Sequence, residues 1–261
     1  MHFTRAIVRP PARSFAGGLS SALEGPPDIN QALVQHAGYV AALRDCGLQV
    51  TRLAPDAAYP DGTFVEDTAI LTGRGAILTR PGAPSREGEV RSMAECLRNF
   101  YADLRGIAAP GTVDGGDICE ADGHFLIGVS GRTNEDGAHQ LAEHLGRLGY
   151  TSSIIDIRAN PALLHLKSGI AYLGDGVWVA DGGIQNDLRF QGCVNARDLI
   201  LVPPSEAYAA NCVRVNDAIL VAAGYPQMSA ALEKRGCRVV HLEMSEFRKM
   251  DGGLSCLSLR F

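Results

Sequence analysis

Two acidic segments of the chain combine carboxylates with residues that favour turns. Residues 60–67 read PDGTFVED, which places three carboxylates within seven residues. Residues 114–117 read DGGD, where two glycines let the backbone approach closely between two carboxylates. Each segment could bind a cation, and each could equally be a solvated turn. The acidic residues alone therefore leave both interpretations open.

Two further segments hold a proton carrier and a nucleophile. His165 lies between leucines in LLHLKS (163–168), at the expected start of a strand, and Cys256 follows two glycines in MDGGLSCLS (250–258). Taken alone, a buried hydrogen-bonded histidine and a structural cysteine are the simpler interpretations, because the chain has six other cysteines. All four segments, however, fall at or just before the first strand of a repeated unit. If those starts converge, they bring together the parts of nucleophilic chemistry on a cationic substrate.

The elements that must position these segments recur at an interval of about 50 residues. Each repeat is expected to contain a hairpin, then a helix, then a closing strand. The hairpins are predicted at 63–80, 115–130, 165–180 and 211–223. Helices are predicted at 86–101, 134–148 and 226–235. Closing strands are predicted near Ile107 and at 152–157, 198–202 and 237–242.

A fifth unit is expected to be split between the two ends of the chain. Residues 254–260 and 3–9 would pair as its hairpin, with 30–45 as its helix and 48–53 as its last strand. The pattern predicts an α/β fold, a five-bladed propeller of strand–strand–helix–strand units around a central active-site channel. An ordinary α/β sandwich is the alternative. No linker divides the chain, so residues 1–261 are predicted to form one domain.

Composition and charge restrict the partners and the compartment. The 261 residues are 46% hydrophobic and 20% charged, which excludes a disordered chain. A net charge of −5 argues against nucleic acid or an anionic membrane as partner and suits a small cationic ligand. Seven cysteines without metal-site spacing predict free thiols in a reducing compartment. Neither a signal peptide nor a membrane span is read, so we expect a cytoplasmic protein.

In five segments the chain resembles the dimethylarginine dimethylaminohydrolases of the amidine-modifying (pentein) superfamily: TFVEDTAIL, DGGD, RTNEDGA, LLHLKS and KMDGGLSCLS. The resemblance runs over essentially the whole chain and implies a five-bladed α/β propeller. It also implies hydrolysis of Nω-methylated L-arginines to L-citrulline and methylamine or dimethylamine, with no metal and no organic cofactor. The implied partner is a cationic amino-acid substrate, and whether the protein is a homodimer is left open.

The resemblance assigns three residues to catalysis. Cys256 matches the nucleophile, His165 the general acid and base, and Asp114 the carboxylate that holds the histidine. These types suit the reaction, because a guanidinium carbon is a poor electrophile and a thiolate is a strong nucleophile. His165 is expected to titrate near neutrality and so to give a proton to the leaving amine and take one from water.

The resemblance assigns seven further residues to substrate binding. Three carboxylates match ligands of the cationic end, and two arginines match ligands of the α-carboxylate, whose geometry an arginine fork fits. A lid residue and an apolar position, at which the family uses a different side chain, complete the set. In that order the residues are Asp61, Glu66 and Asp67; Arg86 and Arg132; Leu19; and Met250.

Two alternatives to this function remain. An arginine deiminase, or a hydrolase of another guanidino compound, would use the same residue types. Deiminases that resemble this family usually carry an added helical insert, for which 261 residues leave little room. A non-catalytic five-bladed binding protein is the more distant alternative. It predicts loss of the Cys–His–carboxylate set, whereas every member is present in this sequence.

Overall fold

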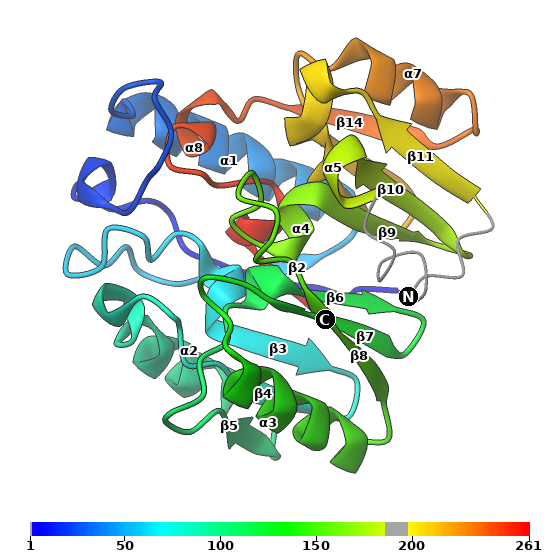
Figure 1. The fold of residues 1–261 in the computed structure, drawn as a ribbon. Coiled ribbons are helices and arrows are strands. Elements are labelled where there is room, and N and C mark those ends of the chain that lie inside the picture. Colours follow the sequence, from blue (N-terminus) through cyan, green and yellow to red (C-terminus); the bar gives the residue numbers. More distant parts are fainter. Residues whose placement is uncertain (1, 186–197) are drawn as a thin grey trace. The chain divides into compact units, whose positions relative to one another are not determined.

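The computed structural model describes residues 2–185 and 198–261 (Figure 1). The chain divides into two compact units, of which the first contains the residues up to Glu66 together with Cys212–Phe261 and the second contains Asp67–Asn211. Across the described part of the chain, no helix is long and apolar enough to cross a membrane. That the whole chain forms a single domain stays a prediction.

Two three-stranded sheets form the first unit, and they share one strand order. The central strand of each pairs antiparallel with one neighbour and parallel with the other. Because β1 pairs with β15, the two ends of the chain meet in one sheet, as the split fifth unit predicts. The strands are β1 (Arg5–Val8), β2 (Gln49–Arg52) and β15 (Leu259–Arg260), then β12 (Val213–Val215), β13 (Ala218–Ala222) and β14 (Arg238–Leu242).

The second unit repeats the same pairing in three sheets. Its strands are β3 (Ala69–Thr72), β4 (Gly75–Leu78) and β5 (Leu104–Gly106); β6 (Ile118–Ala121), β7 (His124–Val129) and β8 (Thr151–Asp156); and β9 (Ile170–Gly174), β10 (Val177–Asp181) and β11 (Asp198–Val202). A parallel pair needs a crossover connection, which explains why a helix precedes the third strand of a sheet. The predicted strand–strand–helix–strand order is therefore present.

Capping and one apolar face determine where the longer helices lie. Helix α3 (Glu135–Arg147) is capped at its N-terminus by Asn134, whose side chain accepts a hydrogen bond from the Gly137 N–H. Its buried residues Leu141 and Leu145 pack into the core, where the helix contacts β7 and β8. The other α-helices are α1 (Ile29–Asp45), α2 (Glu89–Leu97), α4 (Leu166–Gly169), α5 (Gly182–Gln185), α7 (Pro226–Glu233) and α8 (Ser245–Arg248).

Short helical turns stand where strand starts were predicted. The hairpin predicted from residue 63 begins at Ala69, and a 3-10 turn precedes it. His165, predicted at the start of a strand, is instead the residue before α4. Hydrogen bonds from backbone N–H groups to buried carboxylates distant in sequence hold such turns, as from Gly116 to Asp67 and from Leu166 to Asp117. The 3-10 turns are η1 (Phe15–Gly17), η2 (Val65–Thr68), η3 (Pro84–Arg86), η4 (Gly115–Asp117), η5 (Pro204–Ala210) and η6 (Ser255–Leu257).

The described cysteines match the prediction of free thiols. None of the six that the structure describes is in a disulfide, and Cys46, Cys119 and Cys212 are buried. Cys193 lies outside the described residues.

Candidate active site

A buried histidine–carboxylate pair lies in the second unit. His165 Nε2 lies 3.1 Å from Asp114 Oδ2, and the two residues are 7% and 0% exposed. Asp114 is itself held by the Gly82 N–H, which donates to Oδ1 at 2.8 Å. A Cβ at Gly116 would lie 2.6 Å from His165 Nδ1, so only glycine lets the backbone pass this close to the ring. With a carboxylate as acceptor, Nε2 carries the proton of this bond.

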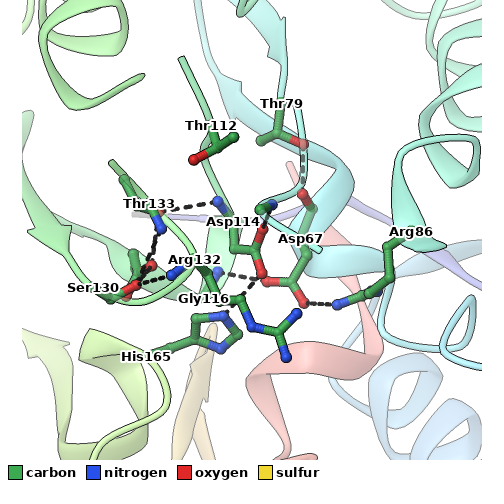
Figure 2. Close-up of polar contacts among 12 residues, drawn as sticks. Asp67, Thr79, Arg86, Thr112, Asp114, Gly116, Ser130, Arg132, Thr133 and His165 are labelled. Atoms are coloured by element: carbon green, nitrogen blue, oxygen red, sulfur yellow. Dashed lines mark hydrogen bonds and ion pairs between the residues drawn. The ribbon is translucent and has the colours of Figure 1, made fainter. Parts of the chain in front are cut away.

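A second carboxylate, Asp67, belongs to the same cluster (Figure 2). Its Oδ1 accepts a hydrogen bond from the Gly116 N–H at 2.8 Å, and its Oδ2 accepts one from Arg86 Nη1 at 2.7 Å. Burial favours the neutral acid, but the Arg86 and His165 charges outweigh it and lower the pKa of Asp67 to about 2. Asp67 is therefore an anion at neutral pH.

Arg86 is one of the two arginines predicted to bind a substrate carboxylate. Its Nε and Nη2 donate to the two oxygens of Glu89 at 3.0 and 2.9 Å, in addition to the bond to Asp67. All three residues are buried. The guanidinium is thus a structural cation between two anions, a role that its residue type and position did not indicate.

Arg132 differs sharply from Arg86. Its backbone N–H donates to Ser130 Oγ at 2.9 Å, and Figure 2 shows its side chain extending toward the Asp67 carboxylate. Within the described residues, its guanidinium has no hydrogen-bond or ion-pair partner. An unengaged cation beside the cluster is suited to an anionic group of a ligand.

The electrostatics of the cluster favour a charged imidazole. Burial lowers the pKa of His165, but Asp67, Asp117 and the bond to Asp114 outweigh it and raise the pKa to about 9. A carboxylate oxygen of Asp67, one of Asp114 and a ring nitrogen of His165 all lie within 4.8 Å of one another. The expectation that His165 titrates near neutrality is therefore wrong, because three buried carboxylates surround it.

Cys256 lies in the first unit, in the 3-10 turn η6. The Gly253 N–H donates to its Sγ at 3.4 Å, which favours the thiolate form of a partly buried sulfur. The preceding Ser255 donates from Oγ to Glu66 Oε2 at 2.7 Å. Glu66 is 4% exposed, with Arg260 Nη2 lying 3.8 Å from its other oxygen. The nucleophile candidate and one predicted cation ligand are thus joined through a single serine.

The lid candidate also lies in the first unit. The Leu19 N–H donates to both oxygens of Asp61, at 3.1 and 3.2 Å. A Cβ at Gly18 would lie 2.4 Å from Asp61 Oδ1 and 3.1 Å from Met250 Cε. Three predicted binding residues therefore meet around Gly18, and of these only Leu19 is exposed, at 42%.

The predicted residues fall into two sets, because the chain passes from the first unit to the second between Glu66 and Asp67 and returns between Asn211 and Cys212. Leu19, Asp61, Glu66, Met250 and Cys256 belong to the first unit, and Asp67, Arg86, Asp114, Arg132 and His165 to the second. Sequence reasoning missed the contributions of Ser255, Glu89, Ser130 and Thr133. Thr133 and Ser255 lie in the RTNEDGA and KMDGGLSCLS segments, but those segments do not indicate the partners of either residue.

The class of protein follows from the fold and this site. A model of the arginine deiminase family matches residues 57–198. The N-terminal domain of ArgZ, a cyanobacterial arginine dihydrolase, superposes with a TM-score of 0.89 at 19% identity, covering 100% of this chain and 97% of that one, a likeness of fold. A buried histidine–carboxylate pair on such a fold defines an amidine-modifying enzyme of the arginine deiminase family.

Similar proteins give the family more narrowly. The N(G),N(G)-dimethylarginine dimethylaminohydrolase of Pseudomonas aeruginosa is 43% identical over 260 residues, 99% of this chain and 100% of that one. The one of Streptomyces coelicolor is 30% identical over 98% and 96%. A structure of the P. aeruginosa enzyme, a cysteine-to-serine variant complexed with citrulline, superposes with a TM-score of 0.95 at 42% identity over both whole chains. The chain belongs to the dimethylarginine dimethylaminohydrolase family, and the predicted α/β-propeller class of five blades is confirmed.

Proposed function

We propose that the protein hydrolyses Nω-methylated L-arginines to L-citrulline and methylamine or dimethylamine. The observation that carries the proposal is the 43% identity to a dimethylarginine dimethylaminohydrolase over nearly the full chain. A relative of known structure is complexed with citrulline, and another, a histidine-to-glycine variant, is an adduct with S-methyl-L-thiocitrulline, with a TM-score of 0.94 at 43% identity. Both bound molecules carry the amino-acid end that the proposed substrate has.

The first step of the proposed reaction is attack by Cys256. The thiolate forms a bond to the guanidinium carbon, and an electron pair of that carbon's π system moves to nitrogen. The positive charge of the bound substrate and the Gly253 N–H bonded to Sγ both stabilise the thiolate. The product is a tetrahedral adduct that remains covalently attached to sulfur.

The second step needs an acid, for which His165 is suited. A pKa of about 9 keeps the imidazole protonated at neutral pH, so it can give its proton as the bond to the methylated nitrogen breaks. The amine leaves and a thiouronium remains on Cys256. The neutral imidazole then takes a proton from water, which attacks the same carbon to give a second tetrahedral adduct. The carbon–sulfur bond breaks and restores the thiolate, the hydroxyl proton of the adduct passes to solvent or to the released amine, and citrulline departs. No metal or organic cofactor takes part.

The binding residues divide by charge. Asp61, Glu66 and Asp67 are proposed to hold the cationic end by charge-assisted hydrogen bonds. Arg132 is proposed to hold the α-carboxylate, supported by its lack of a partner in the described chain. Arg86 is bonded to Asp67 and Glu89, which supports a main role in keeping Asp67 ionised and oriented. Its contact with the α-carboxylate of the substrate is proposed to be secondary.

The remaining positions concern access and location. Leu19 is proposed to close over the substrate, with Met250 packed beneath the loop that carries it. The spacing of the seven cysteines, which fits no disulfide framework, supports a reducing compartment, and we infer that the protein acts in the cytoplasm. A small cationic amino acid is the proposed partner, and a homodimer stays a prediction without support from the contacts described.

A substrate panel tests this function. Asymmetric dimethylarginine, monomethylarginine and unmodified arginine are supplied separately, and citrulline and the released amine are both quantified. We expect equimolar citrulline and dimethylamine or methylamine from the methylated substrates, and much slower release of ammonia from arginine. Equal turnover of arginine would favour the deiminase alternative. No turnover of any guanidino compound would favour the binding protein.

A further inference from the structure

One buried carboxylate of the second unit has no part in the proposed mechanism. Asp117, the last residue of the DGGD segment, is 0% exposed. Its Oδ1 accepts a hydrogen bond from the Leu166 N–H at 3.0 Å. Its Oδ2 accepts two more, each 2.7 Å long, from the hydroxyls of Ser130 and Thr133. A buried carboxylate with three donors is a built feature rather than a solvated turn.

Each donor connects Asp117 to a different residue of the candidate site. Leu166 directly follows His165 and begins α4. The hydroxyl of Thr133 accepts the Asp114 N–H at 3.1 Å. The hydroxyl of Ser130 accepts the Arg132 N–H at 2.9 Å, and Figure 2 shows these two hydroxyls beside the backbone that they hold. One side chain thus links the histidine, its carboxylate partner and the proposed carboxylate-binding arginine.

The direction of these bonds depends on the charge of Asp117. An ionised carboxylate only accepts hydrogen bonds, so each hydroxyl must give its single proton to Asp117. The oxygen lone pairs of Ser130 and Thr133 are then left to accept the backbone N–H groups of Arg132 and Asp114. An amide at position 117 presents an N–H₂ group to one side, and at least one of the three bonds must be lost or reversed.

We propose that Asp117 is a positioning residue that, as an anion, sets the orientation of His165, Asp114 and Arg132 for the reaction. The inference rests on the proposed function for its kinetic consequences. It acts through the backbone of the site and through its charge, and it does not touch the substrate.

The charges around His165 agree with this role. The titratable groups on α4 and on the elements packed against it are Asp117, Cys119, Glu120, Lys167, Tyr172, Glu206 and Tyr208. Of these, Asp117 contributes to the raised pKa of His165, as do Asp67 and Asp114 from their own segments. Burial raises the pKa of Asp117 itself to about 6, which leaves it ionised at neutral and higher pH.

The test is the variant Asp117→Asn, which keeps the shape and removes the charge. We expect kcat for dimethylarginine to fall by tenfold or more, roughly the lower part of the range for proton transfer, with KM changing by less than about threefold. We also expect the pKa of His165, followed by NMR of labelled histidine, to fall by about one unit. Asp181→Asn is the matched control, because Asp181, the last residue of β10, likewise accepts N–H groups at the start of a short helix, α5. It should leave both quantities unchanged.

A second pair of variants applies if Asp117→Asn does not fold. Thr133→Val removes the hydroxyl between Asp117 and Asp114, whereas Thr133→Ser keeps it. Thr133→Val should lower kcat by threefold or more, and Thr133→Ser should retain the wild-type value. Wild-type kcat and an unchanged His165 pKa in folded Asp117→Asn would overturn the inference, as would equal kcat values for the two Thr133 variants. The NMR titration reports on His165 whether or not methylarginine is the substrate, so failure of the proposed function is distinguishable.

Discussion

The cluster around His165 and the lid segment, residues 17–23, are held in opposite ways. His165, Asp67 and Asp114 are all buried, and each is bonded to side chains or backbone that are buried too. In the lid segment, Leu23 is 100% exposed. The hydrogen bonds that hold this segment come from its backbone N–H groups and serine hydroxyls, and they go to Asp61, the Lys249 carbonyl and Asp251. The proton-transfer group is therefore pre-organised, while the segment proposed to admit substrate is held by bonds that water can replace.

Loss of the imidazole should give the largest effect. His165→Gly is expected to lower kcat by about 10²–10⁴-fold with little change in KM, because proton transfer to the leaving amine is lost. Added imidazole should restore part of the rate. His124→Gln is the control, since among the described residues the imidazole of His124 bonds only to the side chains of Thr151 and Ser153. A change in KM alone would show that His165 binds substrate or packs in the core.

The two arginines sharpen the comparison by separating stability from binding. Arg86→Met leaves Asp67 and Glu89 as buried anions without their cation, so we expect the unfolding free energy to fall by about 3–5 kcal/mol. Arg132→Met should change it by less than about 0.5 kcal/mol. Urea unfolding of both variants measures this difference.

Substitution of Arg132, although it should hardly change stability, should weaken substrate binding. Arg132→Met is expected to weaken methylarginine binding by about 1.5–3 kcal/mol, the range for a charge-assisted hydrogen bond. A substrate without the carboxylate, such as a methylated agmatine, should be bound poorly and lose little more. Equal losses on both substrates would contradict the carboxylate role of Arg132.

The lid should respond more weakly, and through KM. At Gly18 a Cβ would lie 2.4 Å from Asp61 Oδ1, so Gly18→Ala must displace the carboxylate that accepts the Leu19 N–H. Loss of that bond should raise KM by about two- to tenfold, corresponding to about 0.5–1.5 kcal/mol, with kcat nearly unchanged. Gly17→Ala is the matched control, because nothing lies within 4 Å of its Cβ position. If both variants had the same KM, the Leu19–Asp61 contact would have no part in binding.

A further expected effect is a dependence of stability on alkaline pH. The folded pKa of His165, about 9, is above its ordinary value of 6.5. The stabilisation from its charged form is therefore complete below pH 6.5 and is lost as the pH rises through 9. The difference in unfolding free energy between wild type and His165→Gln should shrink over this window. A difference that grew with pH would show that His165 is buried in its neutral form.

The repeating unit was predictable from sequence because its physics is local. Turn residues set the hairpins, and a parallel third strand requires a crossover, so each repeat shows the same order of signals. The turns that carry the chemistry were not predictable in this way. The Gly116 N–H is bonded to Asp67, and the Leu166 N–H to Asp117, each across 49 positions of sequence. No local pattern encodes contacts of that range.

The candidate site shows the same division. Residue types and the family resemblance selected His165, Asp114 and Asp67, and the structure brings them together. The partners of Arg86, and the raised pKa of His165, depend on which carboxylates share one buried volume. Those charges come from separate turns, so only the folded arrangement reveals them.

The central claim, covalent catalysis by Cys256, is tested most directly by mass spectrometry of enzyme quenched during turnover of dimethylarginine. The account predicts an adduct on the peptide containing Cys256, absent from Cys256→Ser, which should be folded and inactive. His165→Gly should accumulate the adduct if it slows hydrolysis more than formation. An adduct on Cys119 or Cys212 instead, together with an active Cys256→Ser, would contradict the account.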